Sequence, residues 1–203
     1  MENDFQTEQK KGDPQMSDKT TVTGTFTQNR TRTLTLIGLM AAVLCILGPF
    51  SIPIPVSPVP LSLTNFAVYI TVYILGIRSG TVSVLLYLCL GVAGLPVFSG
   101  FGGGLGKLAG PTGGYLIGFL FVALIQGFLM EHFPWKRPAD IAGMVSGLAV
   151  CYAFGTLWLA WQMHLTPAAA LGIGVIPYLP GDAVKIILAA AVGPKLRGRV
   201  RKV

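Results

Sequence analysis

The stretch GLPVFSGFGGGLGKLAGPTGGY, Gly94 to Tyr115, is the part of the sequence from which the rest can be ordered. It contains nine glycines, two prolines and a single charge, Lys107, and it lies between two long apolar segments. Because glycine has no Cβ, such a run can adopt positive φ angles and bring its backbone close to a bound molecule. Non-helical backbone at membrane depth occurs only where it is buried in protein or lines a cavity. The stretch is therefore either a ligand-binding element or a flexible surface connector.

The same stretch is not a phosphate-binding loop. That motif requires a glycine five residues before its Gly-Lys pair and a Ser or Thr directly after it. Phe101 and Leu108 occupy these two positions around Gly106-Lys107. No soluble strand–turn–helix unit surrounds the stretch, so a dinucleotide site is excluded as well.

Charged residues are scarce and unevenly placed along the chain. Of 203 residues, 52% are hydrophobic and 11% are charged, whereas about 25% are charged in a typical soluble domain. Apolar runs of about 20 residues are long enough to cross a bilayer as helices. Charge-free stretches cover residues 33–77, 79–106, 108–130 and 141–181. The sequence therefore predicts an all-α integral membrane protein.

Six transmembrane helices are expected, with a sharp turn and two irregular segments between them. Arg78 and Gly80 predict a tight turn between the second and third spans. Five prolines between Pro49 and Pro60 predict an extended loop, which either covers a cavity as a lid or lies at the membrane interface. Pro and Gly also break residues 165–180, which predicts a short re-entrant or interfacial piece. The six spans are expected at about residues 31–50, 61–77, 81–97, 112–130, 141–163 and 181–195.

These spans divide the chain into three parts. Residues 1–30 are polar and are predicted to be a disordered N-terminal extension, because they hold too few apolar side chains to form a core. Residues 31–196 form the predicted six-helix transmembrane domain, and residues 197–203 form a basic tail.

The placement of basic residues predicts the orientation in the membrane. Six spans put both termini on one side, and Lys107 is then the only basic residue in the loops of the opposite side. Because cytoplasmic loops carry an excess of Lys and Arg, both termini are predicted to be cytoplasmic. The net charge of +7 owes much to the C-terminal tail, which favours contact with anionic lipid rather than with nucleic acid.

Asp182 and Lys185 are the ionisable residues that fall inside a predicted span. A charge in the membrane is costly, so such residues usually mark a substrate or ion path. Their i, i+3 spacing puts both side chains on one helix face. Asp182 precedes Lys195 by thirteen residues, or about 20 Å of helix, which places it near the outer surface of a core about 30 Å thick. The pair either binds a small molecule that carries hydrogen-bonding groups and a carboxylate or pins two helices together.

The sequence carries no pattern typical of an enzyme. The residues around Ser146 and around Ser99 lack the Gly-x-Ser-Gly spacing of an intramembrane serine protease. No carboxylate pair suited to acid–base catalysis and no set of metal ligands is apparent. Because there is no nucleotide site either, active transport would need a partner that hydrolyses ATP.

Three segments together resemble the BioY family, the biotin-specific substrate-binding (S) components of energy-coupling factor (ECF) transporters. They are GLPVFSGFGGGLGKLAGPTGGYLIGF (94–119), VPLSLTNFAVY (59–69) and LPGDAVK (179–185). The resemblance covers about residues 31–196. It implies the six-helix ECF S-component fold, one biotin bound near the outer face as the transported substrate, and no cofactor. It also implies the cytoplasmic membrane of a prokaryote and assembly with a membrane T component and two ABC-type ATPases.

The resemblance also implies roles for individual residues. Asp182 would accept from a ureido N–H of biotin, and Lys185 would pair with its carboxylate or its ureido oxygen. The small residues of the first helix, Gly38, Ala41 and Ala42, would face the T component. The full set of expected substrate-binding residues is Asp182, Lys185, Tyr115, Gly102, Gly103, Gly104, Asn65 and Tyr178.

Two other functions fit the same residues. One is an S component for a different small vitamin, and the other is a structural membrane subunit that binds no small molecule. Competition among vitamins for binding would distinguish an S component for another vitamin from one for biotin. A structural subunit would show no rise in melting temperature when a ligand is added.

Overall fold

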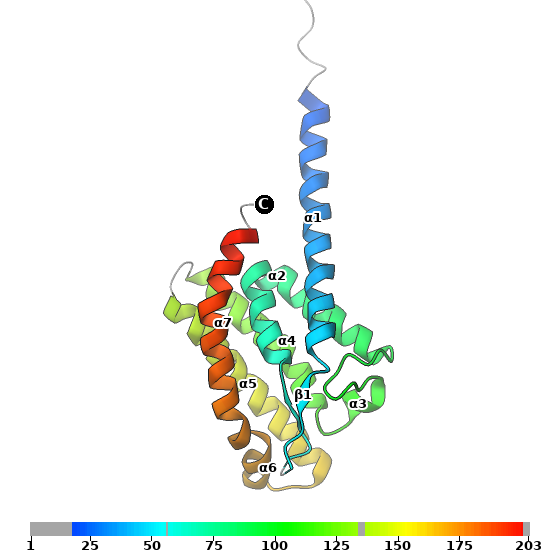
Figure 1. Cartoon of the computed structure of the whole chain (residues 1–203), viewed down its shortest axis with the longest axis vertical. Coiled ribbons are helices and arrows are strands. Elements are labelled where there is room, and N and C mark those ends of the chain that lie inside the picture. The colour runs from blue at the N-terminus through cyan, green and yellow to red at the C-terminus, as the bar shows by residue number, and fades with distance from the viewer. Residues whose placement is uncertain (1–17, 56, 134–136, 201–203) are drawn as a thin grey trace, which may run out of the picture. The chain divides into compact units, whose positions relative to one another are not determined.

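The computed structural model describes residues 18–55, 57–133 and 137–200, and these are mostly helical (Figure 1). The described residues fall into two compact units, with the boundary between Thr35 and Leu36. The elements in chain order are α1 (Asp18–Leu47), β1 (Ser51–Ile52), β2 (Leu61–Ser62), α2 (Thr64–Val92), α3 (Leu105–Ala109), α4 (Gly113–His132), α5 (Arg137–Met163), α6 (Pro167–Gly174), the 3-10 helix η1 (Ile176–Tyr178) and α7 (Leu179–Val200).

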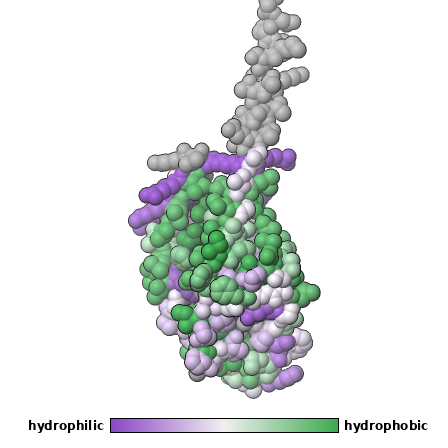
Figure 2. All heavy atoms as spheres, turned by 45° about the vertical axis from the view of Figure 1, so that its right-hand side comes forward, coloured by the Kyte–Doolittle hydropathy of each residue, from purple (hydrophilic) through white to green (hydrophobic). Residues whose placement is uncertain are grey.

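Five helical stretches among the described residues are long and apolar enough to cross a membrane. They are Arg30–Leu47, Thr64–Val92, Gly113–His132, Arg137–Met163 and Pro167–Val200. Large apolar side chains are exposed on these helices, for example Leu85 on α2, Leu157 on α5 and Ile187 on α7. The face drawn in Figure 2 shows a broad apolar band bordered by hydrophilic side chains. This is the surface expected of a helical protein surrounded by lipid.

The first helix is longer than the sequence predicted. It begins at Asp18 rather than near residue 31, so residues 18–30, predicted to be disordered, are helical in the structure. Extending an existing helix adds one hydrogen bond for each residue that is fixed, which makes such growth easier than starting a new helix. The remainder of the predicted extension, residues 1–17, lies outside the described residues.

A sharp bend at Gly76 divides α2. Its backbone is non-helical there, with φ 76° and ψ −172°, a combination that essentially only glycine adopts. A Cβ added at Gly80 would lie 3.2 Å from the Cα of Val72, whereas eight residues of straight helix span about 12 Å. The two halves of α2 therefore lie against each other near the bend. The turn that we predicted at Arg78 and Gly80 is at Gly76 instead, and both of those residues lie in the helical run that follows.

Another helix supplies the hydrogen-bond acceptor that this bend requires. The amide of Ile77, the first residue after the bend, donates to Oε1 of Glu131 at the end of α4, at 3.1 Å. A carboxylate in this position accepts from an N–H group that has no partner inside its own helix, and it also complements the positive end of the helix dipole.

Helices α4 and α5 pack closely in antiparallel orientation along two rows of small residues. A Cβ added at Gly118 would lie 2.6 Å from Sγ of Cys151, and one added at Gly147 would lie 3.0 Å from Cα of Val122. Gly114 and Gly143 make similarly close approaches at the two ends of the interface. Small residues at such spacing let helix backbones approach each other in a membrane. Contacts of α4 with α2, and of α7 with α2 and α5, complete the bundle (Figure 1).

Two irregular segments lie outside the helices. The proline-rich segment, residues 49–55 and 57–62, forms a narrow hairpin in which Ser51 pairs with Ser62 and Ile52 with Leu61. We call this segment the strap. The glycine-rich segment folds back on itself through a bridge between Phe98 and Gly102 and then forms the short helix α3.

Candidate functional site

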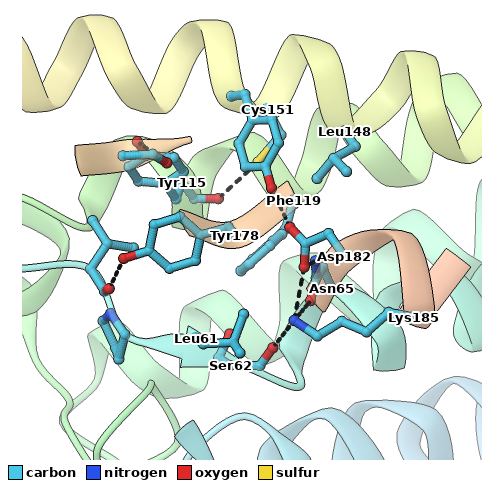
Figure 3. A pocket seen from close by; sticks show the side chains of 14 residues that line it. Leu61, Ser62, Asn65, Tyr115, Phe119, Leu148, Cys151, Tyr178, Asp182 and Lys185 are labelled. Atoms are coloured by element: carbon cyan, nitrogen blue, oxygen red, sulfur yellow. Dashed lines mark hydrogen bonds and ion pairs between the residues drawn. The ribbon is translucent and has the colours of Figure 1, made fainter. Parts of the chain in front are cut away.

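A pocket opens between the end of the strap and helices α2, α4, α5, α6, η1 and α7, with an empty volume of about 400 Å³ including the space at its mouth (Figure 3). Its apolar wall includes Leu61, Phe119 and Leu148. Its polar side chains are those of Ser62, Asn65, Tyr115, Tyr152, Tyr178, Asp182 and Lys185.

The first turns of α7 place a buried ion pair in this pocket. Asp182 and Lys185 lie one helical turn apart, and Nζ of Lys185 is 2.8 Å from Oδ1 of Asp182. The two residues are only 4% and 8% exposed. Because Asp182 lies in the first turn, its negative charge also complements the positive end of the helix dipole. The single-face arrangement predicted from the i, i+3 spacing is present in the structure.

Asn65 in the first turn of α2 connects both members of the pair. Its Nδ2 donates to Oδ1 of Asp182 at 2.7 Å, and its Oδ1 accepts from Nζ of Lys185 at 3.1 Å. The three side chains therefore close a ring of hydrogen bonds between helices that are far apart in sequence (Figure 3). Buried polar groups normally find partners in this way, because an unpaired one is costly.

Every N–H group of the Lys185 ammonium has a partner. Besides Asp182 and Asn65, it donates to the main-chain oxygen of Ser62 in the strap at 2.5 Å. An ammonium group has three donors, so in this state none is free for a ligand. The carboxylate and the ammonium also cancel in charge. The cluster is thus a neutral but strongly polar surface, and a ligand must exchange with one of these partners to reach Lys185.

Tyr152 of α5 is a pocket residue that we did not predict from the sequence. Its hydroxyl group donates to Oδ2 of Asp182, the carboxylate oxygen that Asn65 and Lys185 leave open. The sequence offered one signal, since Tyr152 is the only tyrosine in the charge-free span 141–163. A tyrosine hydroxyl group in an apolar span needs a hydrogen-bond partner, although the sequence does not identify that partner.

The opposite side of the pocket holds the two predicted tyrosines. Tyr178 donates to the main-chain oxygen of Val59 in the strap. Tyr115 donates to the main-chain oxygen of Gly174 at 3.1 Å and lies 3.4 Å from the hydroxyl oxygen of Thr156. Five of the eight predicted substrate-binding residues are thus brought together, namely Asn65, Tyr115, Tyr178, Asp182 and Lys185.

Gly102, Gly103 and Gly104 are not among the residues that line this pocket. The backbone of their segment is engaged elsewhere, because Gly104 N donates to the oxygen of Gly91 at 2.7 Å and Gly102 exchanges hydrogen bonds with Phe98. A Cβ at Gly103 would lie 2.3 Å from the oxygen of Leu95. In the structure these glycines allow the segment to pack tightly against the end of α2.

The predicted partner-facing residues of α1 do not share one exposed face. Gly38 and Ala42 are exposed, and a Cβ added at Gly38 would meet no atom within 4 Å. Ala41 is only 2% exposed and belongs to the interior. Helical geometry explains the difference, because positions four apart share a face whereas adjacent positions are separated by about 100°.

Metal ligation finds no support among the described residues. No group of three or more His, Cys, Asp or Glu side chains in that part of the chain lies close enough together to hold an ion.

Fold and pocket together define a multi-pass helical membrane protein with a pocket that is lined by a buried polar cluster. Comparison with known families makes the assignment more specific: the sequence model of the BioY family matches residues 16–202. The chain therefore belongs to the BioY family, whose members are transport subunits rather than enzymes.

Individual relatives cover most of the chain. A biotin transporter BioY of Thermotoga maritima is 38% identical over 169 residues, covering 82% of this chain and 96% of the relative. A biotin transporter BioY of Rhizobium etli is 36% identical over 80% of this chain and 91% of the relative. A probable biotin transporter BioY of Pyrococcus horikoshii is 34% identical over 83% of this chain and 98% of the relative.

A solved structure shares the fold. It is the crystal structure of the S-component for biotin from an ECF-type ABC transporter, with a TM-score of 0.79 and 30% identity. The match covers 84% of this chain and 93% of that one. The fold is therefore that of an ECF S component.

Proposed function

We propose that this protein captures biotin and takes it up across the cytoplasmic membrane as the S component of an ECF-type transporter. One observation carries the proposal. Asn65, Tyr152 and Lys185 all form hydrogen bonds to the carboxylate of Asp182, and all four residues line one pocket. The family and its biotin-transporting relatives supply the identity of the ligand.

The chemistry of the cluster fits a cyclic urea. Asp182 supplies an acceptor for a ureido N–H, and Lys185 supplies a donor for the ureido oxygen once it releases Ser62. The thiophane ring of biotin would lie against the apolar wall near Phe119 and Leu148. Because the ion pair is neutral overall, we assign the uncharged ureido ring, rather than the carboxylate, to this end of the pocket.

We also propose six membrane spans, with the two halves of α2 counted separately and both termini in the cytoplasm. The bend at Gly76 supports the count, because it lets two helical segments of α2 run in different directions. Basic residues support the orientation: Arg78 and Arg137 would lie on the side of the termini, and Lys107 on the other. The prokaryotic relatives support a location in the cytoplasmic membrane.

The proposed partners are a membrane T component and two ABC-type ATPases. The sequence has no nucleotide-binding motif of its own, so the energy for transport would come from these ATPases. Gly38 and Ala42, exposed on one face of α1, are the proposed contact with the T component. Biotin is the transported substrate in this scheme, no cofactor takes part and nucleic acid is not a partner.

Biotin binding to the purified, detergent-solubilised protein tests the proposal. We expect tight binding by the wild type and loss of binding in Lys185→Ala and Asp182→Asn. Lys107→Ala is a matched control, because this lysine is not among the pocket residues.

Competition by other vitamins completes the test. A folded wild type that binds a different vitamin would redirect the substrate assignment. A folded wild type that binds none, with no ligand-dependent rise in melting temperature, would favour a structural subunit.

A further inference from the structure

We infer that Tyr152 is a specificity-determining residue, which covers one oxygen of Asp182 and thereby makes the pocket prefer a neutral cyclic urea to a cyclic guanidinium. The inference rests on the proposed function, since it concerns how the same pocket distinguishes between biotin and a close analogue. It assigns a role to a residue of α5, whereas the functional residues predicted from the sequence lie elsewhere.

The position of Tyr152 differs from that of the other members of the cluster. Asp182 and Lys185 are almost completely buried, whereas Tyr152 is half-buried and lines the pocket. Its hydroxyl oxygen lies next to Oδ2 of Asp182, to which it donates. A ligand that approaches Oδ2 therefore meets the tyrosine hydroxyl group at the same point.

The hydrogen bonds of the carboxylate leave little room for further donors. Oδ1 accepts from Nδ2 of Asn65 at 2.7 Å and from Nζ of Lys185 at 2.8 Å. Each carboxylate oxygen has about two lone-pair positions, so Oδ1 is filled. Oδ2 accepts from Tyr152, which leaves one position. The carboxylate can thus take a single N–H from a ligand.

A single acceptor position favours one class of ring. A cyclic urea offers one N–H to Oδ2 and one oxygen to a donor, which matches a neutral cluster. A cyclic guanidinium carries a positive charge and N–H groups in place of that oxygen, and it binds best to a carboxylate with both oxygens open. Asp182 is already paired to Lys185 and covered by Tyr152, so no counter-charge is available for such a cation. Its desolvation free energy would therefore not be compensated.

The phenol also has a second property that suits a urea. Its oxygen can accept a hydrogen bond while its O–H donates to Asp182. A ureido N–H can therefore bind to Tyr152 and to Oδ2 together, without displacing either group. Phenylalanine at this position would keep the ring and remove both functions.

The test compares biotin with 2-iminobiotin, in which a cyclic guanidine replaces the urea and is protonated at neutral pH. Both dissociation constants are measured by titration calorimetry with the detergent-solubilised full chain, for the wild type and for Tyr152→Phe. We expect the wild type to prefer biotin. In Tyr152→Phe we expect biotin to bind at least about tenfold more weakly, and the preference for biotin over 2-iminobiotin to fall by at least about tenfold.

Two further variants separate specificity from general damage. Tyr178→Phe removes another tyrosine hydroxyl group from the same pocket, one that bonds to Val59 rather than to Asp182. It should change both dissociation constants by a similar factor and keep their ratio. Tyr152→His keeps a ring N–H donor and should retain more of the preference than Tyr152→Phe. If Tyr152→Phe does not fold, Tyr152→Leu, which also removes the hydroxyl group, takes its place, and an unchanged ratio in that variant would overturn the inference.

The outcomes distinguish this inference from the function on which it rests. A wild type that does not bind biotin would overturn both. A wild type that binds biotin, together with a Tyr152→Phe variant whose ratio is unchanged, would overturn the inference alone, because Tyr152 would then be a packing residue.

Discussion

Lys185 donates to the main-chain oxygen of Ser62 at 2.5 Å, so the ammonium group that balances Asp182 also holds the strap to α7. Lys185 therefore belongs to the binding site and also holds the strap in place. If a ligand oxygen replaced the Ser62 oxygen as the acceptor for Lys185, this contact with the strap would be lost. Ligand binding is thus coupled to the position of the strap.

Removing the charge of Lys185 should destabilise the ligand-free protein. In Lys185→Met, the carboxylate of Asp182 would remain buried without its counter-charge, and breaking a buried pair in this way costs about 3–5 kcal/mol. We expect a clear drop in melting temperature in detergent. The double variant Asp182→Asn/Lys185→Met should recover much of it, since no unpaired charge remains.

Lys107→Met is the matched control for this experiment, since Lys107 lies outside the pocket. Equal melting temperatures for the single and the double variant would show that the unpaired charge of Asp182 does not cause the loss of stability.

The strap should become more mobile when its hydrogen bond to Tyr178 is removed. Tyr178 donates to the main-chain oxygen of Val59, and Tyr178→Phe deletes that bond while keeping the ring. We expect faster amide hydrogen exchange in residues 57–63. Ligand dissociation should be faster by about fivefold, which corresponds to a bond worth about 1 kcal/mol. Tyr115→Phe is the control, because the Tyr115 hydroxyl group bonds to Gly174 and not to the strap. Unchanged exchange in Tyr178→Phe would mean that the hairpin holds its position without this contact.

The ion pair could be predicted from the sequence, because its geometry is local. Two ionisable residues three apart in an apolar helix must share a face, and the structure pairs Asp182 with Lys185 at 2.8 Å. Tyr152 could not be assigned to the same cluster. Its bond to Asp182 joins residues 30 positions apart, and that of Asn65 joins residues 117 apart, so both depend on how the helices pack.

The role of the glycine-rich segment could not be predicted from the sequence either. The density of its glycines predicted either a binding element or a connector, since glycine permits close approach without specifying what approaches. In the structure, other residues of the same chain lie close to these glycines: Gly103 packs against Leu95, and Gly104 forms a hydrogen bond with Gly91. The bend of α2 was predicted within a few residues, yet its position depends on the positive φ of Gly76, and the sequence offers Gly80 as a second candidate.

The bend itself should require glycine. Gly76→Ala would force a side chain into a backbone region with φ 76° and ψ −172°, at a cost of about 1–3 kcal/mol. The new Cβ would also lie 3.2 Å from Oε1 of Glu131, which accepts from the amide of Ile77. We expect a lower melting temperature and lower yield. Gly106→Ala is the control, because it lies in α3 and an added Cβ there meets no atom within 4 Å. Wild-type stability in Gly76→Ala would show that the bend can move to another residue.

The two faces of α1 should respond differently to larger side chains. Gly38 and Ala42 are exposed, so Gly38→Leu and Ala42→Leu should leave the fold and biotin binding of the isolated protein intact. If this face contacts the T component, the same changes should abolish co-purification with it and biotin uptake in cells, because leucine prevents close helix approach. Ala41 is 2% exposed, so Ala41→Leu should instead overpack the interior and lower the melting temperature by an amount equivalent to about 1–3 kcal/mol. Assembly and uptake that survive both Gly38→Leu and Ala42→Leu would place the partner contact on another helix.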